Sequence, residues 1–137
     1  MVRHTDWMAR LMRAVETARV LPFAYGLHDC CTFAAYCVDA MREGSRIGEL
    51  MQQRHPYKDE EDAYEYIETQ GGLTGLVSQY LGAPMENTKL ATVGDVCVAH
   101  DDVKEVVGVI IGHNIVAPGS RGLRSMPLRD LIAAWSV

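Results

Sequence analysis

The segment FAYGLHDCCTFAAYCVDAM, residues 23–41, marks where a loop turns into a helix and places a cysteine at that point. Asp29 is a residue type that commonly caps the N-terminus of a helix. Apolar residues then recur at intervals of three and four, which predicts a helix with one apolar face that ends near Gly44. Cys30 is therefore expected in the first turn, either as a nucleophile or as a small core residue. The apolar face comprises Cys30, Phe33, Ala34, Cys37, Val38 and Met41.

Other helices are predicted on both sides of this segment. Thr5 is a candidate N-cap for a first helix, which Pro22 ends. Two short helices are expected over 59–68, with an acidic solvated face, and over 73–81, while 45–60 is predicted to be a surface connection.

The pattern changes in the last third of the chain. Strands are predicted over 93–100, 105–112 and 115–118, and Pro127 is expected in the first turn of a final helix that ends near Trp135. Helices followed by a small antiparallel sheet indicate the α+β class, in a single domain over residues 1–137.

The composition excludes several classes of function. Hydrophobic residues make up 48% of the 137 residues, which is enough for a globular core, and the formal net charge is −5. Without a basic run, a protein that tracks nucleic-acid phosphates is not expected. Apolar stretches stay well below the roughly 20 residues of a membrane helix, and the charged N-terminus does not resemble a signal peptide.

The cysteine spacing does not indicate a metal or disulfide framework. There are four cysteines, and none forms a Cys-x-x-Cys pair. A zinc or iron–sulfur site would require all four to converge, so reduced and mostly buried thiols are the simpler expectation, with no cofactor. The four are Cys30, Cys31, Cys37 and Cys97.

Five motifs follow one another in an order typical of a known enzyme family. They are FAYG at 23–26, DCCTF at 29–33, VGD at 93–95, VVGVIIG at 106–112 and IVAP at 115–118. Together they resemble the NlpC-type branch of the papain-like cysteine peptidases. In that family the same places are occupied by an aromatic–Trp–Gly loop, an Asp-Cys helix start, a Gly-Asp strand entry and a His-Val-Gly strand. The resemblance implies a papain-like fold, with the cysteine-bearing helix packed on a small antiparallel sheet.

The chain is more similar still to small phage-encoded NlpC-like proteins found among tail genes. That pattern adds Pro-Phe before the glycine loop, a central Gly-Gly, and a tail of Gly-Leu, Pro-Leu and Ala-Trp. The matching residues are Pro22-Phe23, Gly71-Gly72, Gly122-Leu123, Pro127-Leu128 and Ala134-Trp135.

This resemblance assigns Cys30 the place of the nucleophile, where a helix N-terminus lowers the pKa of a thiol. It assigns Val106 the place of the catalytic histidine and Val116 the place of the residue that orients it, because Gly108 and Gly112 set the register. Valine cannot accept a proton. Loss of such a base typically costs on the order of 10⁴-fold in rate, so catalysis is expected to be lost.

Histidines elsewhere offer a replacement base, and His100, at the end of the first predicted strand, is the best candidate. The alternative for His100 is an exposed turn residue beside Asp101. His28 could shift the pKa of the Cys30 thiol from the loop, whereas His4, His55 and His113 lie in segments predicted to be exposed.

The remaining motif residues have structural roles as their simplest interpretation. Asp29 is expected to be a helix cap and Phe33 a core residue, while the motif glycines serve turns and close packing, and Asp95 belongs to the strand entry. The glycines are Gly26, Gly94, Gly108 and Gly112.

The resemblance implies a structural component of a phage or phage-derived tail tip that has lost catalysis. Its expected partners are other tail proteins, namely the hub, the distal tail protein and the tip protein, and its expected location is the virion after synthesis in the bacterial cytoplasm. The alternative is an active peptidase or amidase that cuts peptidoglycan peptides during genome delivery, with Cys30 as nucleophile and His100 as displaced base.

Overall fold

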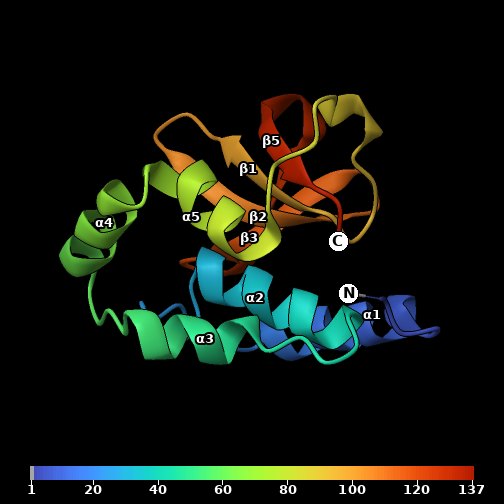
Figure 1. Ribbon diagram of the computed structural model, residues 1–137, viewed down its shortest axis with the longest axis horizontal. Helices are drawn as coiled ribbons and strands as arrows, with labels where there is room; N and C mark the ends of the chain where they lie inside the picture. Colours follow the sequence, from blue (N-terminus) through green and yellow to red (C-terminus); the bar gives the residue numbers. More distant parts are fainter. Residues whose placement is uncertain (1) are drawn as a thin grey trace.

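The computed structural model describes residues 2–137 and has an α+β architecture, as the order of the patterns predicted. The helices gather on one side of the molecule and the strands on the other, with α4 at its outer end (Figure 1). The helices are α1 (Trp7–Arg19), α2 (Cys30–Met41), α3 (Ile47–Arg54), α4 (Glu60–Thr69) and α5 (Gly72–Leu81). The strands are β1 (Val96–His100), β2 (Glu105–Ile111), β3 (Asn114–Gly119), β4 (Gly122–Pro127) and β5 (Leu131–Trp135).

The five strands form one antiparallel sheet in the order β4-β3-β2-β1-β5. Strand β1 pairs along its whole length with β2, from Val96 opposite Val109 to His100 opposite Glu105. The hairpin of β3 and β4 is also fully paired. Because β3 pairs with β2 only from Val109 to Ile111, the first half of β2 is left uncovered on that side.

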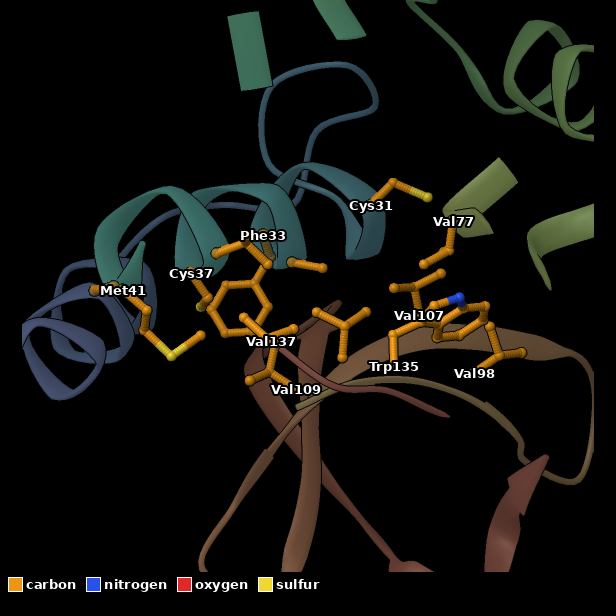
Figure 2. Packing of buried hydrophobic residues seen from close by; sticks show 14 of the residues in the cluster. Cys31, Phe33, Cys37, Met41, Val77, Val98, Val107, Val109, Trp135 and Val137 are labelled. Atoms are coloured by element: carbon orange, nitrogen blue, oxygen red, sulfur yellow. The ribbon is translucent and has the colours of Figure 1, made fainter. Parts of the chain in front are cut away.

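The main core lies between α2 and one face of the sheet. Figure 2 shows Phe33, Cys37 and Met41 of α2 directed toward Val109 and Val137. Trp135 is fully buried, and its indole N–H donates to the Gly82 carbonyl oxygen at 3.0 Å. The predicted apolar face of α2 is confirmed, except that Cys30 remains partly exposed.

A second, smaller cluster fills the opposite face of the sheet. It includes Cys97, Val106, Ile110, Ile115 and Ala117. Gly108 lies between these side chains, and a Cβ atom there would approach the Ile115 Cγ2 to 2.5 Å. The glycine is therefore needed for close packing, as predicted.

Three sequence expectations about secondary structure were wrong. The N-cap residue of α1 is Asp6 rather than Thr5, and it makes no side-chain capping bond. The predicted final helix is instead a 3₁₀ turn, Leu128–Asp130, followed by the edge strand β5, because pairing with β1 buries Trp135. The predicted surface connection over 45–60 contains α3. Its start is capped from α2, since Asp39 accepts from the Ile47 and Gly48 N–H groups at 2.8 and 3.0 Å.

Asp95, at the entry to β1, joins the two ends of the chain. Its carboxylate accepts from the Thr92 N–H at 2.9 Å, the Val137 N–H at 3.1 Å and the Arg3 guanidinium at 3.4 Å. Gly94 precedes it with a φ of +91°, which favours glycine. The Gly-Asp motif therefore has a structural role here.

Candidate functional site

The loop before α2 holds Cys30 at the helix N-terminus through hydrogen bonds to Asp29. The Asp29 carboxylate accepts from the Thr32 N–H at 2.9 Å and from the Gly26 N–H at 2.8 Å, and the Thr32 hydroxyl accepts from the Asp29 N–H at 2.7 Å. This capping box confirms the predicted role of Asp29. Gly26 has a φ of +83°, and a Cβ atom there would lie 2.1 Å from the Tyr57 carbonyl oxygen. The turn over residues 26–32 that leads into α2, called the α2 corner below, therefore requires glycine at position 26.

Cys30 opens onto a cavity of about 550 Å³, a size typical of small-ligand sites. Its walls come from four parts of the chain. They include Phe23 and Tyr25 before α2, Tyr57, Ala63, Tyr64 and Ile67 on or near α4, Lys104, Glu105 and Val106 at the start of β2, and Pro118–Ser120, Gly122 and Arg124 from the β3–β4 hairpin.

The cavity forms where β3 separates from β2. Ile110 directs its N–H and C=O toward the β1 side, where they bond with Asp95 and Gly94. Because these groups alternate in direction along an antiparallel strand, Val107 directs its N–H toward the uncovered side. The first turn of α2 packs against β2 there, and the Val107 N–H lowers the pKa of the Cys30 thiol.

Val106 and Val116, to which the resemblance assigned the places of the base and of the residue that orients it, lie on opposite faces of the sheet. Val106 belongs to the cluster on the far face and lines the Cys30 cavity. Val116 packs against the main core, beside Val109 with which it pairs. The resemblance implies that these two positions work together, whereas the strand register separates the two valines.

The environment of Cys30 favours its thiolate. A hydrogen bond from Cys31 is the largest cause that lowers the pKa of Cys30, and the Val107 N–H and the charge of Lys104 lower it further. Burial and the Asp29 carboxylate oppose this shift. The same thiol–thiol bond, together with burial, raises the pKa of Cys31 well above its usual value. Cys30 is therefore the more acidic thiol of the adjacent pair.

The histidines do not gather at Cys30. Among residues 2–137, none lines the cavity. His100, the proposed displaced base, is exposed at the end of β1, where its Nδ1 contacts the Asp101 carbonyl oxygen. His28 is buried with its ring edge-on to Phe33, and burial lowers its pKa. His55 stacks on Tyr66 beside α4, with ring centroids 4.3 Å apart.

Sequence reasoning missed the polar groups at the cavity mouth. The Lys104 ammonium donates to the Tyr64 hydroxyl at 3.1 Å, linking the β1–β2 turn to α4. Arg124 pairs with Asp101 at 2.8 Å, and Asp101 also accepts from the Val103 and Lys104 N–H groups. The sequence indicates a turn at Asp101-Asp102, before β2. It does not show that this turn lies near Cys30, because that proximity depends on the register of the sheet.

The cysteines do not form a metal cluster. Cys37 belongs to the main core and Cys97 to the opposite face of the sheet, and burial raises the pKa of each thiol to about 12. Within the described range 2–137, no group of three or more His, Cys, Asp or Glu side chains is placed to hold a metal ion. Nor does any helix in that range have the length and apolar character needed to cross a membrane.

Comparison with known proteins gives one match. Residues 2–137 fit the model of the family DUF6950, described as a domain of unknown function. No curated protein and no solved structure matches the chain. Since the family model covers nearly the whole sequence, the chain belongs to the DUF6950 family.

Proposed function

We propose that this protein is a structural component of a phage or phage-derived tail tip, built on an NlpC-like papain fold that has lost catalysis. The observation that carries the proposal is Val106, which lines the Cys30 cavity at the position of the family's base. An apolar side chain there cannot take the thiol proton or protonate a leaving amine.

The order of elements supports the same proposal. A cysteine opens a helix that packs on an antiparallel sheet, as the resemblance implies. The corner around Asp29 and Gly26 retains its hydrogen bonds although the base is absent. A domain kept for its shape would retain such structural residues and lose the proton-transfer residues, because the structural residues contribute more to folding.

The test combines particle composition with complementation. Mass spectrometry of gradient-purified particles should detect the protein alongside the hub, the distal tail protein and the tip protein. A gene deletion should abolish assembly of complete tails, and a Cys30→Ala allele should restore it. Trp135→Ala, which removes a fully buried side chain, is the control expected to fail. Absence of the protein from particles would contradict the proposal.

A second candidate function is peptidoglycan hydrolysis, because Cys30 opens onto a ligand-sized cavity and its pKa is lowered. Cys30 would be the nucleophile and His100 the base, after turning away from the Asp101 carbonyl oxygen. This activity predicts peptide release from purified peptidoglycan that both Cys30→Ala and His100→Ala abolish. Equal release by parent and variants, or none by any, would remove this candidate.

A further inference from the structure

The cavity around Cys30 supports one kind of thiol chemistry that needs no histidine. Cleavage of an amide requires a proton for the leaving amine, and the described residues bring no imidazole to this cavity. Exchange with a disulfide requires only an accessible thiolate, since the leaving group is itself a stable thiolate. The two reactions therefore make different demands on the same cavity.

We propose that Cys30 is a nucleophilic thiolate that forms mixed disulfides with small disulfide-containing ligands entering the cavity. The Cys30 sulfur attacks one sulfur of the ligand, a new S–S bond forms, and the ligand's own S–S bond breaks. One half of the ligand stays attached to Cys30, and the other half leaves as a thiolate. The ligand is the oxidant, because Cys30 is oxidised while the departing half is reduced.

Access separates Cys30 from the other three cysteines. Its side chain is partly exposed in the cavity. Cys31 also borders the cavity but is only 7% exposed, and Cys37 and Cys97 are buried. Figure 2 shows Cys31 directed toward Val77 of α5, within the apolar core. An incoming disulfide therefore meets Cys30 as the most exposed of the four thiols.

Three features of the structure stabilise a thiolate at this position. Cys30 opens the twelve-residue helix α2, the Val107 N–H lowers the pKa of its thiol, and Lys104 lines the same cavity. Asp29 opposes the thiolate, although the Gly26 and Thr32 N–H groups solvate its carboxylate. The titratable groups that line the cavity are Tyr25, Asp29, Cys30, Cys31, Tyr57, Tyr64, Lys104, Glu105 and Arg124.

Cys31 is expected to preserve the mixed disulfide. To release the ligand, Cys31 would have to become a thiolate and attack the neighbouring sulfur. Burial raises the pKa of Cys31 even without its bond to the Cys30 thiol, and its place in the first turn of α2 does not suit a disulfide between adjacent residues. Cys30 would therefore carry a stable adduct that an external thiol removes.

This inference shares with the proposed function the absence of an imidazole at Cys30, but it does not depend on the location in a tail. Peptide release from peptidoglycan would contradict the loss of catalysis and leave thiol exchange standing. An unreactive Cys30 in a protein found in tails would contradict only the present inference.

The test uses 4,4′-dithiodipyridine, a neutral disulfide, with the native full-length chain. We expect one thiol per chain to react rapidly, and peptide mapping should identify it as Cys30. At pH 7 the reaction should be about fivefold or more faster than that of Cys30 in the urea-unfolded chain. The midpoint of its pH profile should lie below ~8.5, the value of a free thiol. Cys30→Ser should remove the fast reaction.

A matched pair of variants tests the cationic partner. Lys104→Met should slow the reaction at pH 6 by about threefold, because the thiolate loses a nearby positive charge. Lys89→Met, in the 3₁₀ turn that packs on β5 at another part of the fold, should leave the rate unchanged. Two results would overturn the proposal: a native Cys30 with the rate and pH profile of the unfolded chain, or a fast thiol that maps to another cysteine.

Discussion

The α2 wall and the β2 wall of the Cys30 cavity differ in the chemical groups that they present to the thiol. On the α2 wall, Asp29, Gly26 and Thr32 form a closed set of hydrogen bonds that holds the cysteine at a helix N-terminus. On the β2 wall, the position facing this corner is the buried and apolar Val106. One wall can stabilise a thiolate, and the other has no imidazole to move its proton.

This contrast separates two requirements that occur together in a cysteine peptidase. The position and the lowered pKa of the nucleophile depend on the backbone at a helix N-terminus. The helix cap that fixes this backbone also stabilises the fold. A base depends on one side chain, and at Val106 the side chain instead fills an apolar cluster. The base can therefore be lost with less damage to the fold than the corner.

The largest effect is expected from a change in the α2 wall at Gly26. Gly26→Ala should lower the free energy of unfolding by about 4 kcal/mol, because the residue has positive φ and the new Cβ would meet the Tyr57 carbonyl oxygen at 2.1 Å. Urea denaturation measures this loss. Gly112→Ala is the matched control, since its φ is +61° but no atom lies near. It should cost only about 1–2 kcal/mol. Equal losses would show that the Tyr57 contact does not constrain the corner.

The helix cap gives the next largest effect. Asp29→Ala should lower the free energy of unfolding by about 2–3 kcal/mol, because it removes a cap and leaves the buried Gly26 N–H without an acceptor. Asp29→Asn should cost less, since an amide oxygen can still accept one of the two bonds. It should also lower the pKa of Cys30 by removing a nearby negative charge. Alkylation of Cys30 at pH 6 that does not become faster would contradict this electrostatic role.

The β2 wall can be given the group that it lacks. Val106→His should speed alkylation of Cys30 at pH 6 by about threefold or more, because an imidazolium on the cavity wall favours the thiolate. Iodoacetamide labelling with peptide mapping measures the rate. Val116→His is the control, because Val116 lies on the opposite face of the sheet and should have no effect. An equal gain in both variants would mean that the strand register does not separate these positions.

The smallest effect is expected at the turn that leads into the β2 wall. Bonds from the Lys104 and Val103 N–H groups, and from Arg124, lower the pKa of Asp101 to about 2. A lowered pKa in the folded state stabilises the protein above the unfolded value of ~3.9, and this contribution is lost as the pH falls through about 2. Asp101→Asn should cost less than about 1 kcal/mol at pH 7. Urea denaturation at several pH values should show the difference disappearing near pH 2, and a difference that persists there would contradict it.

Local sequence signals were sufficient for the α2 corner and for most helices. Asp29 lies next to the turn it caps, and the apolar spacing from Phe33 to Met41 needs no distant partner to be recognised. Asp59 likewise caps α4 by accepting from the Asp62 N–H at 2.8 Å. In each case the interacting groups lie within one or two helical turns, so the amino-acid order specifies them.

Long-range contacts governed the elements that the sequence did not predict. The α3 helix receives its cap from Asp39 of another helix, and β5 is a strand because β1 offers it an unpaired edge. The opposite orientations of Val106 and Val116 follow from a register that starts at Val109. Pairing and burial between distant segments outweigh local propensity at these positions, and they also create the cavity that brings Lys104 to Cys30.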